Sequence, residues 1–191
     1  MLRLIAHGLL KLGGWTPVGG DIPVPKAVMI AAPHTSNWDG IWGLICRVAL
    51  QVDVHFFAKD TLFWFPLGTV LRALGGVPLD RRKPGAAVPT AVAALRDNDT
   101  CYFALAPEGT RSRKDYWKSG FYRIAMEAQV PVVLGFFDYR SRRIGTGPVI
   151  ELTGDVDADM ARIRAFYETC EGRHPELATP AVLPPEKPAR R

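Results

Sequence analysis

The sequence has few cysteines and no long apolar run, and both features narrow the class of protein. Three cysteines occur in 191 residues, far apart at Cys46, Cys101 and Cys170. An odd number of widely spaced cysteines argues against a disulfide-stapled fold, and none of them has the spacing of a zinc site. No apolar run reaches the roughly 18 residues that a membrane-spanning helix needs. We therefore predict a reducing compartment, no bound metal and no transmembrane helix.

Acidic residues are outnumbered by basic ones, which predicts an anionic partner. The chain has 24 Lys and Arg against 19 Asp and Glu, and the surplus is concentrated between positions 111 and 143. A phosphate-bearing substrate, a lipid surface and a nucleic acid would each suit this charge. We expect no nucleic-acid partner, because no known binding motif accompanies this region and aromatic residues do not alternate with its arginines.

Short apolar strands alternate with helical segments along the chain. We expect strands over Val28–Pro33, Asp53–Ala58, Cys101–Ala106, Val130–Tyr139 and Val149–Leu152. We expect helices over Trp38–Leu50, Leu62–Leu74 with a break near Pro66, Ala86–Arg96, Gly120–Ala128 and Asp157–Glu171. This alternation predicts a single α/β domain with a mixed, largely parallel sheet flanked by helices on both faces. The main domain is expected over 21–175, after an amphipathic helix and linker (1–20) and before a flexible, proline-rich tail (176–191).

The start of the chain has the pattern of a basic amphipathic helix. Basic residues recur every four positions, at Arg3, His7 and Lys11. Apolar residues occupy the other side of this helix: Leu2, Ile5, Leu9 and Leu12. Such a helix suits a membrane interface, and a helix packed on its own domain would show the same pattern. The aromatic-rich stretch from Phe56 to Leu74 is a second candidate for a membrane-facing patch, for an apolar groove, or simply for core.

A histidine and an aspartate follow the first predicted strand. In a helix, five residues place two side chains about 140° apart, so His34 and Asp39 can meet only if the helix begins between them. Ser36 and Asn37 are good caps for that start. A carboxylate bonded to one imidazole nitrogen fixes the tautomer and makes the other nitrogen more basic. With no activated serine or cysteine evident, we interpret His34 as a general base for a substrate hydroxyl. The alternative is a surface histidine in a capping loop.

Two further clusters follow later strands or turns, where ligands gather in open α/β sheets. Gly76 precedes a turn that leads to three cations beginning at Arg81, which could hold a phosphate. The second cluster, Glu108-Gly109-Thr110-Arg111, directly follows an apolar strand. Its glycine lets a ligand approach the backbone, and its arginine and threonine can bind phosphate oxygens. Its glutamate can accept a bond from a substrate hydroxyl or hold the arginine. A Walker loop is excluded, because its glycine and lysine pattern is missing.

Four ordered blocks of this sequence are similar to those of a known enzyme family. They are His34-x4-Asp39, Gly76-x4-Arg81, Glu108-Gly109-Thr110-Arg111-Ser112 and Val130-Pro131-Val132-Val133. Taken together, they resemble the glycerophospholipid acyltransferases, the family of the bacterial 1-acylglycerol-3-phosphate acyltransferases, and in particular a small-sized subgroup. The match covers about residues 28–133, over half of the chain.

This resemblance implies an acyltransferase fold and a reaction in phospholipid biosynthesis. A fatty acyl group would move from acyl-CoA or acyl carrier protein to a hydroxyl of a lysophosphatidic-acid-like acceptor, with no metal or organic cofactor. The family's pattern assigns His34 as the base and Asp39 as the residue that orients it. It assigns acceptor binding to Gly76, Arg81, Glu108, Gly109, Thr110 and Arg111.

The resemblance also implies contact with a membrane surface, and we expect a peripheral enzyme on the cytoplasmic face of the cell membrane. Two alternatives stay open at this stage. The acceptor could be a different lipid, such as another lysophospholipid or an aminoacyl-type lipid. In a different class, the chain could be a non-catalytic module that binds lipid or nucleic acid.

Overall fold

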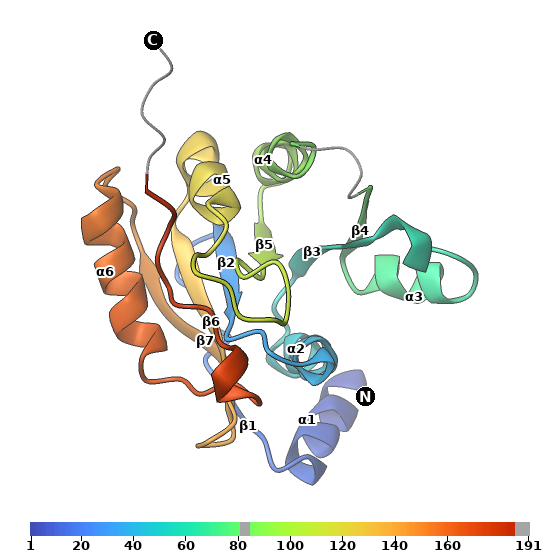
Figure 1. Cartoon of the computed structure of the whole chain (residues 1–191). Coiled ribbons are helices and arrows are strands. Elements are labelled where there is room, and N and C mark those ends of the chain that lie inside the picture. The colour runs from blue at the N-terminus through green and yellow to red at the C-terminus, as the bar shows by residue number, and fades with distance from the viewer. Residues whose placement is uncertain (81–84, 186–191) are drawn as a thin grey trace.

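A computed structural model describes residues 1–80 and 85–185, and within these ranges the chain forms a seven-stranded sheet (Figure 1). The strands are β1 (Thr16–Val18), β2 (Lys26–Ala32), β3 (Val54–Lys59), β4 (Gly76–Leu79), β5 (Cys101–Leu105), β6 (Val132–Asp138) and β7 (Arg143–Ile150). Their order in the sheet is β1-β7-β6-β2-β5-β3-β4. Neighbouring strands are parallel except β6 and β7, which are antiparallel. The predicted mixed, largely parallel α/β sheet is confirmed.

Helices cover both faces of this sheet (Figure 1). They are α1 (Leu2–Leu12), α2 (Asn37–Leu50), α3 (Leu67–Ala73), α4 (Ala87–Asp97), α5 (Gly120–Ala128) and α6 (Val156–Tyr167), with short 3-10 helices at Asp60–Leu62 and Pro175–Leu177. One face packs against α4, α5 and α6 in the largest apolar cluster. On the other face α2 lies against the sheet, and α1 packs on α2. In the described ranges no helix is long and apolar enough to cross a bilayer.

The central strand β2 shows why this sequence forms a two-sided core. Val28 and Ile30 face the cluster with α4, α5 and α6, whereas Ala27 and Met29 face the opposite side. Alternate residues of a strand point to opposite faces. A parallel strand covered on both faces is therefore a continuous apolar run. For that reason this strand could be predicted from the sequence.

The edges of the sheet differ from the sequence-based prediction. The last strand was predicted over Val149–Leu152, but β7 begins at Arg143. Its two glycines and a proline are weak strand formers, so its first half gave little signal. Gly145 is needed where it stands, because a Cβ there would meet the carbonyl of Val18 on β1. The short strands β1 and β4 were not predicted at all.

The segment after α6 also differs from expectation. Residues 176–185 were predicted to be a flexible tail, yet Thr179 and Ala181 are buried. Trp117 donates its indole N–H to the Thr179 carbonyl (3.1 Å) and its backbone N–H to the Val182 carbonyl (2.8 Å). These bonds, together with the burial of Ala181 in the main cluster, hold this part of the chain against the domain. Residues 186–191 of the predicted tail lie outside the described ranges.

Candidate active site

His34 and Asp39 meet between the end of β2 and the first turn of α2. The carboxylate Oδ2 of Asp39 lies 3.4 Å from Nδ1 of His34. Ser36 is the N-cap of α2, and Asp39 accepts the backbone N–H of Ser36 in a capping box. The helix thus begins between the histidine and the aspartate, as their spacing requires. This contact leaves the other imidazole nitrogen, Nε2, available to a substrate.

Asp39 is fully buried and heavily hydrogen-bonded. Its Oδ2 accepts the backbone N–H groups of Thr35 and Ser36, each at 2.8 Å. Its Oδ1 accepts the hydroxyl of Tyr139 at 2.6 Å. Burial by itself would raise the pKa of Asp39, but hydrogen bonds from His34, Tyr139 and Ser36 outweigh it and hold this pKa below the usual value. Asp39 is therefore an ionised carboxylate that can orient an imidazole.

Glu108 lies after β5 and is buried, with 2% of its surface exposed. Its Oε1 accepts the backbone N–H of His34 at 2.7 Å. Burial raises the pKa of Glu108, while the hydrogen bond from the backbone of His34 partly offsets that rise. Sequence reasoning placed this side chain on the substrate or on Arg111. The structure places it on the backbone that carries the histidine.

The rest of the Glu108 cluster lies at the same edge of the sheet as His34. Strands β2 and β5 are parallel neighbours, so the loops that leave their carboxyl ends are adjacent. Gly109 has a φ of +66°, and a Cβ there would collide with the Lys118 side chain. Thr110 is half-buried and Arg111 is exposed, so both are open to a ligand from solvent.

The remaining predicted residues are farther from His34 or cannot be placed. Gly76 is the first residue of β4, on the edge strand of the sheet. A Cβ there would lie 2.7 Å from the Leu71 carbonyl oxygen, so the glycine lets α3 pack closely against β4. Arg81 lies outside the described residues.

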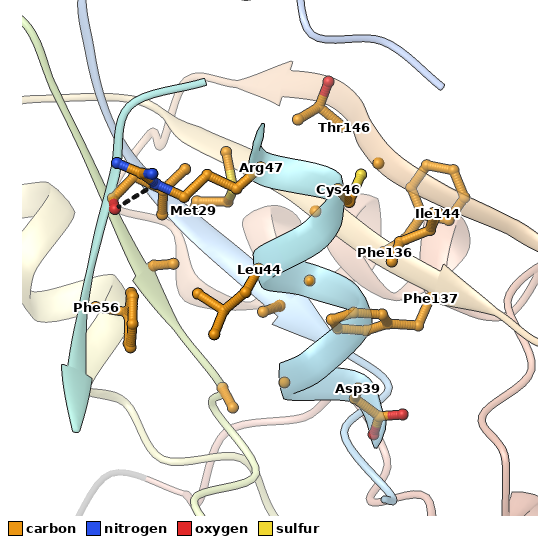
Figure 2. A pocket seen from close by; sticks show the side chains of 18 of the residues that line it. Met29, Asp39, Leu44, Cys46, Arg47, Phe56, Phe136, Phe137, Ile144 and Thr146 are labelled. Carbon is orange, nitrogen blue, oxygen red and sulfur yellow. Dashed lines mark hydrogen bonds between the residues drawn. The ribbon is translucent and has the colours of Figure 1, made fainter. Parts of the chain in front are cut away.

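An apolar cavity of about 340 Å³ lies beneath α2, and His34 and Asp39 are part of its wall. Figure 2 shows Asp39 at one end of it. Its other walls come from α2 itself and from β2, β3, β5, β6 and β7. The residues that line it include Met29, Leu44, Cys46, Phe56, Phe137 and Ile144. The volume is in the range of pockets that bind small molecules. The site therefore combines an oriented base with room for an apolar chain.

The sequence suggested an apolar groove as one interpretation of the aromatic stretch from Phe56 to Leu74, of which Phe56 and Phe57 line this cavity. It did not predict that most of the cavity wall would come from α2 and the other strands. A signal was present in α2, where Gly40 and Gly43 both line the cavity. Two glycines three residues apart share one helix face, and small side chains there leave space beneath the helix.

Comparison with known protein families identifies the class to which this chain belongs. A family model described as Acyltransferase matches residues 18–133. That match spans more than half of the chain, so the chain belongs to this family and is an acyltransferase. The predicted likeness to the glycerophospholipid acyltransferases is thereby confirmed. No curated protein matches the sequence.

A solved structure shares the fold. It is the crystal structure of the 1-acyl-sn-glycerophosphate (LPA) acyltransferase PlsC from Thermotoga maritima, with a TM-score of 0.58 and 19% sequence identity. The alignment covers 88% of this chain and 78% of that one. In residues 1–80 and 85–185, no three histidine, cysteine, aspartate or glutamate side chains gather in a way that could hold a metal ion.

Proposed function

We propose that this protein transfers a fatty acyl group from a thioester, acyl-CoA or acyl carrier protein, to the hydroxyl of a lysophosphatidic-acid-like acceptor. The observation that supports this most is the imidazole of His34, oriented by a buried carboxylate in the wall of an apolar cavity. The acyl chain would lie in the cavity beneath α2 with its thioester carbonyl near the imidazole. The name of the similar PlsC structure indicates the same class of acceptor.

The proposed chemistry is a direct transfer with His34 as the base. Nε2 takes the proton of the acceptor hydroxyl as its oxygen attacks the thioester carbonyl carbon. The tetrahedral intermediate then expels the thiolate, which takes the proton from the imidazolium. Asp39 stabilises that imidazolium through Nδ1, and Glu108 holds the backbone of His34 in place.

A covalent route through the cavity's cysteine is disfavoured by its environment. Cys46 is buried in the cavity wall, and burial raises the pKa of its thiol to about 12. The thiolate is the nucleophilic form of cysteine, so this side chain is almost wholly unreactive near neutral pH.

For the acceptor, we propose that Thr110 and Arg111 hold its phosphate. Both are accessible, and they lie two and three residues after Glu108, which contacts the backbone of His34. Arginine is suited to phosphate because its planar guanidinium donates two parallel hydrogen bonds. Gly76 and Arg81 remain proposed acceptor residues on the strength of the family's pattern alone.

An acceptor panel tests this assignment. Purified enzyme is given labelled acyl-CoA or acyl carrier protein with lysophosphatidic acid, other lysophospholipids, aminoacyl-type lipids or monoacylglycerol, and products are identified by mass spectrometry. We expect Arg111→Ala to raise the KM for lysophosphatidic acid about tenfold, since the lost bond is charge-assisted but exposed. The KM for the donor should not change. Arg123→Ala, which removes an exposed arginine of α5, controls for net charge. Acylation restricted to acceptors without phosphate would overturn the proposal.

For the membrane, we propose peripheral attachment through α1, at the cytoplasmic face where a thioester donor is available. This helix packs on the domain through Ala6 and Leu10, which are buried. Its other apolar side chains are exposed: Leu2, Leu4, Ile5, Leu9 and Leu12. The exposed cations Arg3 and Lys11 would attract anionic lipid. An amphipathic helix of this kind binds in the plane of a bilayer surface.

Vesicle co-sedimentation tests this attachment. We expect binding to require anionic lipid and to weaken as salt rises, because the electrostatic part is worth about 1 kcal/mol per basic residue near the surface. Ile5→Glu should weaken binding strongly, because it places a charge in the inserted face of α1. Met126→Glu is the matched control, since Met126 is also exposed but lies on α5. Equal loss in both variants would contradict a role for α1.

A further inference from the structure

A tyrosine outside the four sequence blocks bonds the second oxygen of Asp39. Tyr139 directly follows β6 and lies 100 residues from the aspartate in sequence. Its hydroxyl donates to Oδ1 at 2.6 Å, while Oδ2 faces His34 and accepts two backbone N–H groups. The two oxygens therefore have separate partners, and rotation of the carboxylate would break bonds at both of them.

Tyr139 is itself held by two direct contacts, one through its ring and one through its backbone, and the ring that it packs on is covered in turn. The edge-to-face contact of its ring with Trp15 has a centroid distance of 4.7 Å and an interplanar angle of 81°. Its backbone N–H donates to the Glu171 carbonyl at 2.8 Å. The guanidinium of Arg142 lies over Trp15, 5.8 Å from the ring centroid. A hydroxyl anchored in this way has a fixed position, which is what a group that orients another side chain needs.

We propose that Tyr139 is a positioning residue for acyl transfer, whose hydroxyl keeps Oδ2 of Asp39 facing His34 and balances part of the carboxylate's charge. This inference rests on the proposed function, since it requires His34 to act as the base. It adds Tyr139, which follows the last residue of β6, to the His34–Asp39 dyad.

The surrounding charges keep Tyr139 in its donating form. Burial raises its pKa above the usual value, and the hydrogen bond to Asp39 with the charge of that residue raises it further. Arg173 and Arg142 oppose this rise only in part. On the other side of the dyad lies Glu108, a buried acidic group that interacts with both His34 and Asp39. The tyrosine thus remains a neutral O–H donor at any pH at which the enzyme is assayed.

The test uses two matched tyrosine variants. Tyr139→Phe removes one hydroxyl and keeps the ring that packs on Trp15. Tyr122→Phe is the control, because Tyr122 also donates to a fully buried carboxylate, Asp159, at 2.8 Å. Each variant loses one bond of the same type, so similar decreases in Tm are expected.

Only Tyr139→Phe should change catalysis. We expect kcat to fall about tenfold, because a hydrogen bond to a carboxylate is strong and the base is no longer held in one geometry. The acidic limb of the pH–kcat profile should move to higher pH by about half a unit. The reason is that the unbonded Oδ1 leaves more negative charge beside the imidazole, which favours its protonated, inactive form. The profile of Tyr122→Phe should coincide with that of the wild type.

A double-mutant cycle separates positioning from general stability. In an Asp39→Ala background, Tyr139 has no carboxylate to hold, so Tyr139→Phe should lower kcat by less than about twofold. If the decreases in kcat caused by Asp39→Ala and Tyr139→Phe multiply in the double variant, the inference is wrong. It is also wrong if the pH–kcat profile of Tyr139→Phe matches that of Tyr122→Phe. These results are distinct from failure of the proposed function, which would show as full activity in His34→Ala.

Discussion

Replacing His34 with alanine is expected to lower kcat by a factor of about 10²–10⁴, the usual effect of losing a general base. The fold should persist, because the bond from the backbone of this residue to Glu108 does not involve the imidazole. Asp39→Asn should lower kcat less, since the imidazole remains while its orientation and charge stabilisation are weakened. Turnover is measured with a thioester donor and lysophosphatidic acid, and circular dichroism shows whether each variant is folded.

A histidine at the other end of the strands provides the control for this experiment. His55 lies near the start of β3, beside Cys101, away from the edge of the sheet where His34 stands. His55→Ala should therefore keep nearly full turnover. Near-wild-type turnover in a folded His34→Ala would refute the proposed mechanism, whichever acceptor is used.

The parts of the site that were predicted correctly are those encoded by short-range spacing. His34 and Asp39 could be brought together from sequence because a strand, a cap and a first helical turn fix their relation within six residues. The proximity of the Glu108 loop followed from a rule on parallel strands, since β2 and β5 are neighbours.

The parts that were missed depend on tertiary contacts. Tyr139 follows a fully buried strand, and nothing in that local pattern indicates which carboxylate its hydroxyl will meet. For Glu108, the position of its loop beside His34 could be predicted, but the bond between its side chain and the backbone of His34 could not. The segment around Thr179 was predicted to be flexible because its composition is rich in proline. Composition does not indicate that Trp117 will bond the backbone of this segment.

The same reasoning applies to the fold. Strands buried on both faces were visible as apolar runs, whereas the outer strands β1 and β4 are three and four residues long. Such short strands are stabilised mainly by their neighbours, so their own residues give little signal. In β7, the Gly145 that permits close pairing with β1 is the kind of residue that suggests a turn in sequence.

The cavity beneath α2 predicts a change in acyl-chain preference when it is filled. Leu44 lines this cavity, and Figure 2 shows its side chain between α2 and Phe56. In Leu44→Trp the larger side chain should exclude the end of a long chain. Burial of each methylene is worth about 0.8 kcal/mol, so excluding three or four of them corresponds to about a hundredfold in kcat/KM.

We therefore expect Leu44→Trp to lose about a hundredfold in kcat/KM with long-chain donors and to keep nearly full activity with short-chain donors. The measurement is a competition between acyl-CoA substrates of different chain length, with products quantified by mass spectrometry. Ile41→Trp is the matched control, because Ile41 is on the same helix but exposed. Its ratio of long to short products should stay that of the wild type. If Leu44→Trp slows both chain lengths equally, the acyl chain lies elsewhere, since a filled cavity would discriminate by length.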